Sequence, residues 1–373
     1  MSGSPVRLST VVMHHPARAP LLADLLPACA KLDPRVIPDP RPDDFASPLR
    51  TAKAAWAAVA DDATHHLVLQ DDVRLADDFA GQLLGLLAGH PGRALTLYTS
   101  WHTPQNSYLV RLATALGAAL APLSAGEWTP TLGLVLPAAR ARELAVFLAR
   151  FPDVVRDEDW LVLTYLRGLG APVMATVPHL LDHTESGTLA GHPGRFHATL
   201  FQPAQPVPHT HWTLDPALER ALSERAALSG PRAFTVELAG SRCLLRMLGL
   251  ERGEPVEHTF GWYWHDWCFL VGADPGRIAD AFDRHRRDRP EPPWPALEVW
   301  AAGYLLGADA AAVAPARSGA GRPGFVRLAV ESWVRSGLRE DDLVRLGEAG
   351  VRELAEVGVA AVTEGAADPL EPQ

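Results

Sequence analysis

A short apolar run that ends abruptly in two adjacent acidic residues constrains this chain more than any other feature. The run covers residues 65–69 and is followed by Gln70, Asp71 and Asp72. Burying an ionised carboxylate costs free energy unless the group is paired or bound to a metal. In α/β sheets, ligands bind at the carboxyl ends of the strands. The pattern therefore predicts a buried strand whose end holds a divalent cation and, behind it, a phosphate. A solvated acidic turn is the alternative interpretation.

Length and composition favour a globular protein of two domains. The chain has 373 residues, of which 47% are hydrophobic and 21% are charged. A formal net charge of −10 argues against a nucleic-acid partner, which would need a basic surface. Cys29, Cys243 and Cys268 provide neither a disulfide framework nor zinc-ligand spacing. With no signal peptide or transmembrane segment evident, we expect a cytoplasmic protein.

Strand-like and helix-like segments alternate through the first half of the chain. Residues 6–13 are rich in β-branched residues and predict a strand, and Pro48 suits the first turn of a helix over 49–60. The alternation continues with helices over 21–31, 77–87, 108–120, 138–150 and 157–169, and with strands over 94–99, 129–136 and 172–181. This order predicts an α/β fold, with a mostly parallel sheet covered by helices on both faces.

A proline- and histidine-rich connector divides the chain. We expect a catalytic domain over residues 1–201, a linker over 202–216 and an accessory domain of unknown role over 217–373. This second domain is expected to be smaller, and either α+β or mainly helical. Its final ten residues are expected to be frayed.

The densest aromatic segment of the chain lies in this second domain, within a strand expected over residues 259–271. Alternate residues of a strand share a face, which groups Phe260 with Trp262 and Trp264. Core packing is the favoured explanation. An exposed aromatic surface would instead recognise an acceptor or a second copy of the chain, as in a homodimer.

Several motifs follow one another in the first half of the chain. The first strand leads into a turn over residues 11–18, and the next helix carries Arg50 and Lys53. An apolar strand then ends in Gln70-Asp71-Asp72, at the position of an Asp-x-Asp motif.

Two further motifs lie downstream in the same order. Glu158-Asp159 opens a helix, and a strand over residues 173–177 is followed by Pro178 and His183. The whole series, over about residues 6–195, resembles the GT-A type glycosyltransferases and is similar in detail to their large inverting family two.

The resemblance implies transfer of a sugar from a nucleoside diphosphate to the hydroxyl group of an unknown acceptor, with inversion. Mn²⁺ or Mg²⁺ held by Asp72, with His183 as a further ligand, would neutralise the departing diphosphate. A base must take the acceptor proton, and Asp159 is the first choice, with Glu158 and Asp157 as alternatives. The helix macrodipole also favours acidic residues at that helix start.

The donor is expected to be a UDP-, GDP- or dTDP-linked sugar. Residues expected to contact it are His15, Arg18, Arg50, Lys53 and Asp71. Arg50 is the preferred diphosphate contact among the basic residues, and Asp71 would accept hydrogen bonds from sugar or ribose hydroxyls. Gln70 stands at the first acidic position of the metal motif and would weaken the metal site.

Other residues compete for these roles. His192 lies in a glycine-containing segment whose backbone amides could approach a phosphate, and Asp182 and Glu185 flank the expected histidine ligand. Trp101 and His102 follow a strand and would lie near the acceptor.

Two other classes of protein stay open. The first is a catalytically inactive binding or scaffold protein that keeps the GT-A-like fold, an alternative that Gln70 favours. The second is a sugar-phosphate nucleotidyltransferase, although the turn over residues 14–18 lacks the glycines that usually cradle a triphosphate. No Gly-x-Gly-x-x-Gly pattern follows an expected strand and no Gly-x-Ser-x-Gly pattern occurs, which argues against a dehydrogenase and a serine hydrolase.

Overall fold

The protein is mixed α/β and divides into two compact units. The computed structural model describes residues 5–45, 47–155, 158–170, 172–184, 196–228, 233–251, 254–257, 260–287 and 293–371. The first unit comprises Met1–Ser100 and Trp128–Leu214, and the second comprises Trp101–Glu127 and Asp215–Gln373. The expected α/β class, with a mostly parallel sheet, is confirmed.

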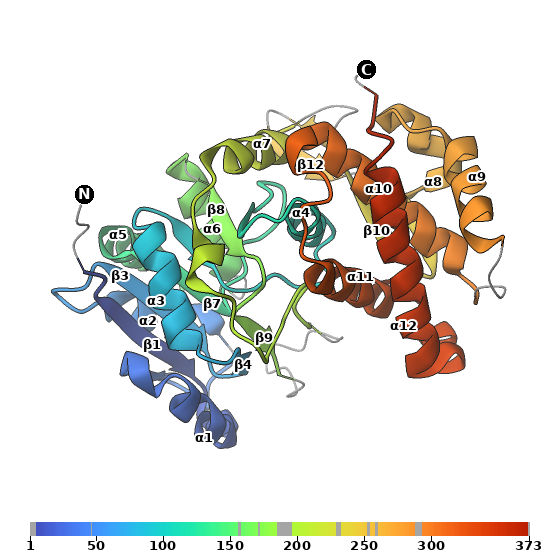
Figure 1. Cartoon of the computed structure of the whole chain (residues 1–373). Helices are drawn as coiled ribbons and strands as arrows, with labels where there is room; N and C mark the ends of the chain where they lie inside the picture. The colour runs from blue at the N-terminus through green and yellow to red at the C-terminus, as the bar shows by residue number, and fades with distance from the viewer. Residues whose placement is uncertain are drawn as a thin grey trace. The chain divides into compact units, whose positions relative to one another are not determined.

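Six strands of the first unit are hydrogen-bonded side by side in the order β2-β1-β3-β7-β5-β8. Figure 1 labels β1, β3, β7 and β8 of this sheet. Their bounds are β1 (Leu8–His14), β2 (Arg35–Pro38), β3 (His65–Gln70), β5 (Ala94–Thr96), β7 (Gly133–Pro137) and β8 (Val173–Thr176). β1 is parallel to β2 and β3, and β5 is parallel to β8, whereas β7 is antiparallel to both β3 and β5. Because β1, β2 and β3 are parallel, the residues that follow them lie at one edge of the sheet.

The centre of this sheet is an uninterrupted apolar core. Leu67, Val68 and Leu69 of β3 are at most 1% exposed, and Val11 and Val12 of β1 are fully buried. Consecutive buried residues are typical of strands covered on both faces.

Helices and a second, smaller sheet complete the first unit. The helices are η1 (Pro16–Arg18), α1 (Ala19–Ala28), η2 (Ala30–Leu32), α2 (Pro48–Ala57), α3 (Phe79–Gly89), α5 (Ala138–Leu148), α6 (Glu158–Gly168) and η3 (His209–Trp212). α2 begins as the sequence predicts, since the Ser47 hydroxyl accepts a hydrogen bond from the Arg50 amide and Pro48 occupies the first turn. β4 (Val73–Leu75) and β9 (Leu181–His183) pair antiparallel, with Val73 opposite His183.

The second unit is α+β and almost equal in length to the first. Its helices are α4 (Pro104–Ala115), α7 (Pro216–Ala226), α8 (Trp264–Trp267), η5 (Cys268–Val271), α9 (Pro275–Arg286), α10 (Ala296–Val313), η6 (Pro315–Arg317), α11 (Pro323–Gly337) and α12 (Glu340–Gly365). Its strands are β6 (Leu120–Pro122), β10 (Phe234–Ala239), β11 (Arg242–Glu251), β12 (Glu254–Glu257) and β13 (Trp262–Tyr263). β11 pairs antiparallel with β10, β12 and β13.

Helix α10 forms the core of the second unit. It packs closely on α12, because a Cβ on Gly307 would lie only 2.1 Å from the Val362 carbonyl oxygen. Among the described residues, α10 is the one helix long and apolar enough to cross a membrane, and 83% of it is buried inside the structure. Burial of this extent is typical of a core helix.

The division into units differs from the expected domain boundaries at one segment. Residues 101–127, expected in the first domain, belong to the second unit. The reason lies in α4, where the Tyr108 hydroxyl donates to Asp309 at 2.7 Å and Arg111 Nε donates to the Ala329 carbonyl at 3.1 Å.

The boundary after Leu214 falls inside the expected linker, whose η3 is fixed by a 3.0 Å contact between His90 Nε2 and the Trp212 carbonyl.

The strand expected over residues 259–271 is wrong. Within the described residues 260–271, Trp262 and Tyr263 alone form a strand, and the chain then turns into α8 and η5. Trp264 is fully buried, while Phe260 and Phe269 are 69% and 56% exposed. The period-two aromatic pattern therefore does not separate a buried face from an exposed one.

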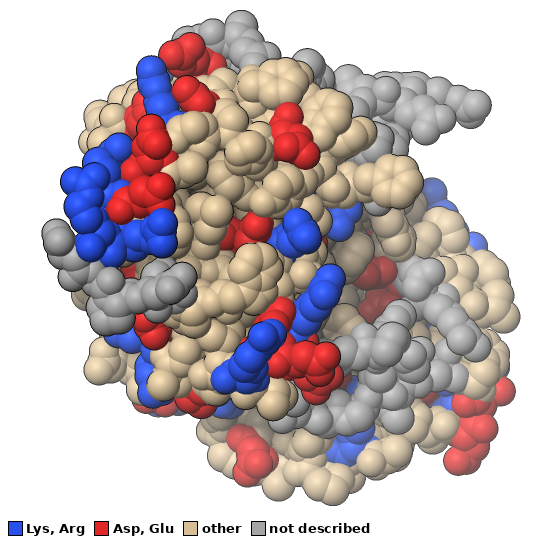
Figure 2. Space-filling model, turned by 90° about the vertical axis from the view of Figure 1, so that its right-hand side faces the viewer, with Lys and Arg blue, Asp and Glu red and all other residues tan. Residues whose placement is uncertain are grey.

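Charged side chains are mixed on the molecular surface. Figure 2 shows basic and acidic side chains next to one another on one face, with broad areas of neither kind. On the described part of this face, the mixture differs from the continuous basic surface typical of nucleic-acid binders.

A buried ion pair links three elements of the second unit. Arg225 Nη2 of α7 lies 2.9 Å from Asp309 Oδ2 of α10, and the two side chains are 6% and 4% exposed. Arg225 Nη2 also donates to the Phe234 carbonyl of β10 at 2.8 Å. The pair thus ties α7 and β10 to the core helix.

We predict that Arg225→Leu lowers the free energy of unfolding by about 3–5 kcal/mol, because it leaves the Asp309 carboxylate buried without its cation. Urea denaturation followed by circular dichroism measures the change. Arg220→Leu is the matched control, since Arg220 lies on the same helix and is exposed, and it should cost less than about 0.5 kcal/mol. Equal losses in the two variants would contradict a special role for the buried pair.

Candidate functional site

Asp71 and Asp72 follow β3 directly and are each only 4% exposed. The turn after β1 surrounds them, because β1 and β3 are paired with Met13 opposite Gln70. His14 Nδ1 lies 2.8 Å from Asp71 Oδ2, and the His15 amide donates to the same oxygen at 2.9 Å. The structure therefore brings together the first turn and the acidic pair, as the sequence predicts.

Arg18 is the main basic side chain at this acidic pair. Its Nη1 lies 3.3 Å from Asp71 Oδ1 and 2.6 Å from Asp72 Oδ2, and its side chain is 14% exposed. A single guanidinium nitrogen thus bridges the two carboxylates. His15 contacts Asp71 through its amide, and its ring accepts a hydrogen bond from the Ala17 amide.

The small sheet brings His183 to Asp72. His183 Nε2 lies 3.4 Å from Asp72 Oδ2, and the Thr184 amide donates to the Asp72 carbonyl at 2.9 Å. His183 Nδ1 contacts the Thr184 carbonyl, which can only accept, so Nδ1 carries a proton and Nε2 faces the carboxylate. Burial is the largest single effect and disfavours charge on both groups, but their mutual hydrogen bond and charge attraction, together with the Arg18 charge at Asp72 and the Thr184 carbonyl at His183, outweigh it. The pKa of Asp72 is therefore lowered and the pKa of His183 is raised.

Asp72 and His183 fit two ligands of a divalent cation. Asp72 Oδ1 is buried and has no hydrogen-bond partner among the described residues. A histidine whose Nδ1–H is held by a carbonyl presents Nε2 as a ligand, and carboxylate and imidazole groups both bind Mn²⁺. No group of three or more His, Cys, Asp or Glu side chains is arranged to hold a metal in the described part of the chain. A cation here would therefore need a bound ligand or water to complete its coordination.

Asp182 stabilises the backbone of β9 and of the segment at Ala198 by accepting hydrogen bonds from two amides. Its Oδ1 accepts hydrogen bonds from the His183 amide at 3.0 Å and the Ala198 amide at 2.7 Å, and its Oδ2 pairs with Arg74 at 3.1 Å. Burial favours the neutral acid, but the hydrogen bonds from His197 and Ala198 prevail, and the pKa of Asp182 is lowered. Its carboxylate therefore holds β9 in place.

A chain of hydrogen bonds connects the end of β3 with the start of α6. Gln70 Nε2 donates to Thr131 Oγ1 at 3.2 Å, and Thr131 Oγ1 donates to Glu158 Oε1 at 3.3 Å. Glu158 is 7% exposed, whereas Asp159 is partly exposed and accepts a hydrogen bond from the Trp160 amide at 2.8 Å. Sequence reasoning missed Thr131, since one threonine in a loop carries no distinctive pattern.

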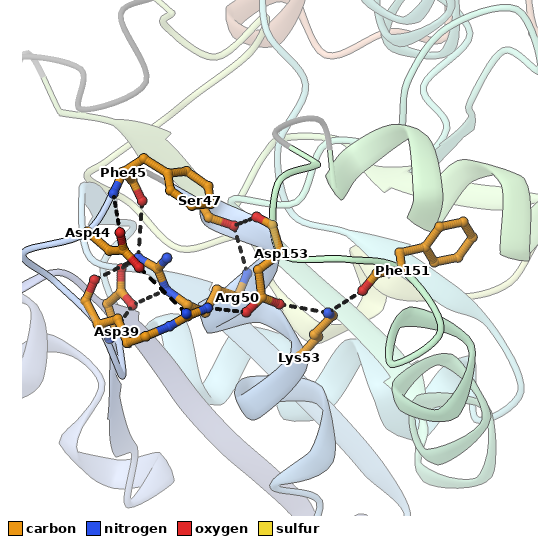
Figure 3. A network of polar contacts seen from close by, with 9 residues as sticks. Asp39, Asp44, Phe45, Ser47, Arg50, Lys53, Phe151 and Asp153 are labelled. Carbon is orange, nitrogen blue, oxygen red and sulfur yellow. Dashed lines mark hydrogen bonds and ion pairs between the residues drawn. The ribbon is translucent and has the colours of Figure 1, made fainter.

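Arg50 and Lys53 are each paired with a carboxylate other than Asp71 and Asp72 (Figure 3). Arg50 is 4% exposed and binds Asp39 through two hydrogen bonds of 2.7 and 2.8 Å. Lys53 Nζ lies 2.8 Å from Asp153 Oδ1. The hydrogen bond from Arg50 is the main cause of a lowered pKa of Asp39. The Arg50 guanidinium thus lies against Asp39, whose charge it neutralises. This position does not support its expected role as a diphosphate contact.

The Asp39–Arg50 pair still lies at the same sheet edge as the acidic pair. The Asp39 amide donates to the His14 carbonyl at 2.8 Å, which fixes the end of β2 beside the end of β1. The pair therefore stabilises the loop next to the site.

The remaining candidates are placed elsewhere or not described. Asp157, Glu185 and His192 lie outside the described residues. Trp101 and His102 belong to the second unit, where their rings meet edge to face with centroids 5.7 Å apart.

Comparison with known proteins does not assign the chain to a family. No protein-family model matches the sequence, and no curated protein matches it significantly. The function must therefore be inferred from the residues of the site.

We predict that Asp39→Asn lowers the free energy of unfolding at neutral pH by about 3 kcal/mol, because Arg50 stays charged and buried. The native pKa of Asp39 lies below the free value of about 3.9. The stabilisation is therefore present above that value and is lost as pH falls through the native pKa. Urea denaturation between neutral pH and about pH 3 should show the gap between wild type and variant closing in acid.

Asp44→Asn is the control for this variant, since the Asp44 side chain lies on the same loop and is 45% exposed. It should change stability little at any pH. A constant gap between wild type and Asp39→Asn across the pH range would disprove the charge-based explanation.

Proposed function

We propose that the first unit is a glycosyltransferase of the GT-A type, which binds a nucleoside-diphosphate sugar at the carboxyl ends of β1 and β3. The observation that carries the proposal is the contact of Asp72 with both Arg18 and His183. One carboxylate oxygen on this residue is buried and has no hydrogen-bond partner in the described part of the chain, as expected for a group that awaits a cation.

The charges at this site match the chemistry of a diphosphate leaving group. Departure of the diphosphate builds negative charge on its oxygens, and positive groups held in a buried site stabilise that charge. Arg18 supplies a guanidinium whose geometry suits phosphate oxygens. Mn²⁺ or Mg²⁺, held by Asp72 and His183 when bound, would act as a Lewis acid on the same oxygens. Gln70 carries an amide in place of a carboxylate and donates a hydrogen bond to Thr131. The site therefore has one carboxylate fewer than the usual metal motif.

An acidic residue at the start of α6 would act as the base. The acceptor hydroxyl gives its proton to the carboxylate while its oxygen attacks the anomeric carbon, and the bond from that carbon to the diphosphate breaks with its electron pair. Asp159 is our assignment, because this residue is more exposed than Glu158. Glu158 is more buried and bonded to Thr131, which suits a positioning role.

Calorimetric titration with UDP, GDP and dTDP, each with and without Mn²⁺, tests the donor site. We predict that one nucleotide binds the wild type in a metal-dependent manner, and that Asp72→Ala weakens this binding by about 10–100-fold because the carboxylate ligand is lost. Asp44→Ala removes an exposed aspartate of the same unit and should bind normally. If no nucleotide binds under either condition, the donor site is disproved and a scaffold protein becomes the better explanation.

The base is tested by comparing Asp159→Asn with Glu158→Gln. We predict that Asp159→Asn lowers kcat for sugar transfer or donor hydrolysis by about 10²–10⁴-fold, with little change in KM for the donor. The measurement is release of the nucleotide identified by calorimetry from its sugar conjugates. Glu158→Gln should lower kcat much less, and the reverse order of effects would assign the base to Glu158.

A further inference from the structure

The second unit contains a pocket of about 340 Å³, a size at the lower end of small-molecule sites. Its walls come from η5, the start of α9, the middle of α10 and the final described residues of the chain. The polar and aromatic side chains that line it are Phe269, Asp274, Arg277, Tyr304, Asp368 and Glu371. Nothing in the proposed chemistry of the first unit uses them.

The final described residues form a wall of this pocket, and Leu370 and Glu371 are not frayed, contrary to expectation. The Leu370 amide donates to the Ala308 carbonyl at 3.3 Å, and the Glu371 amide donates to the Gly272 carbonyl at 3.2 Å. Gly272 has a φ of +83°, and a Cβ there would lie 2.5 Å from the Glu371 carbonyl oxygen. The close approach of the two backbones therefore requires glycine.

The polar groups of the pocket suit a neutral ligand with several hydroxyls. The Asp368 carboxylate accepts a 2.6 Å hydrogen bond from Tyr304 and pairs with Arg277 at 3.2 Å, so these three groups are held in place. Arg277 and Asp274 are 61% and 60% exposed, which leaves them accessible to a ligand. Three acidic residues and one arginine line the pocket, and this excess of negative charge disfavours phosphates and other anions.

An exposed aromatic surface adjoins these polar groups. Phe269 lines the pocket and is 56% exposed. The Trp267 ring is nearly parallel to it, at 21° and 6.3 Å, and Trp262 lies 4.3 Å from Trp267. An exposed aromatic face can stack on the C–H face of a sugar ring, while carboxylates and guanidinium groups bond to its hydroxyls.

We propose that this pocket binds the pyranose ring of a neutral carbohydrate, with Phe269 as the stacking surface and Arg277, Asp274 and Asp368 as hydroxyl partners. The binding does not depend on the proposed activity of the first unit. The second unit would thereby act as a carbohydrate-binding domain.

Saturation-transfer NMR on the full chain, with glucose, N-acetylglucosamine, mannose, maltose and cellobiose as probes, tests this site. We expect at least one probe to bind the wild type, and its signal to fall at least about fivefold in Phe269→Ala and in Arg277→Ala. Phe260→Ala is the matched control, since Phe260 is a 69% exposed phenylalanine of the same unit that does not line the pocket. It should bind as the wild type does.

Two results would overturn the proposal. One is that none of the probes binds the wild type, and the other is that Phe269→Ala and Arg277→Ala bind as well as Phe260→Ala. Asp72→Ala separates the two sites, because it should lose nucleotide binding and keep carbohydrate binding. Loss of carbohydrate binding in Asp72→Ala alone would place the sugar at the first unit and exclude the pocket.

Discussion

Two adjacent carboxylates buried at the end of a central strand are the constraint on which the first unit depends. Asp71 and Asp72 cannot stay ionised in an apolar sheet without compensation. The turn after β1 supplies His14 and Arg18, and the β4–β9 sheet supplies His183. Each of these elements thus contacts a buried carboxylate, and the proposed binding of a cation and a phosphate at this edge rests on the same arrangement.

The basic residues of the first unit divide into two kinds by their partners. Arg50 is committed to Asp39, with both side chains almost fully buried, and removal of either would leave a buried charge. Arg18 is more exposed and bridges two carboxylates through one nitrogen, so a ligand can reach it. Arg50 therefore stabilises the fold at this sheet edge, whereas Arg18 is the arginine that we propose for ligand binding.

The second unit shows how one local pattern can mislead. The aromatic segment after residue 259 alternates as a strand would, yet only Trp264 is fully buried, and the chain turns into a short helix there. Its neighbours, the half-buried Trp267 and the exposed Phe269, have nearly parallel rings, and Phe269 lines a pocket together with the final described residues. The amides of Leu370 and Glu371 are held there by hydrogen bonds to Ala308 and Gly272, far away in sequence.

Local pattern by itself determined β3, the start of α2 at Pro48 and the α/β class. These follow from burial periodicity and helix capping, which short stretches of sequence encode. Only the tertiary structure decided that Arg50 pairs with Asp39, that Thr131 joins Gln70 to Glu158 and that α4 belongs to the second unit. The physical reason is that a charge or hydroxyl is satisfied by whichever group lies nearest in space, and periodicity carries no information about that neighbour.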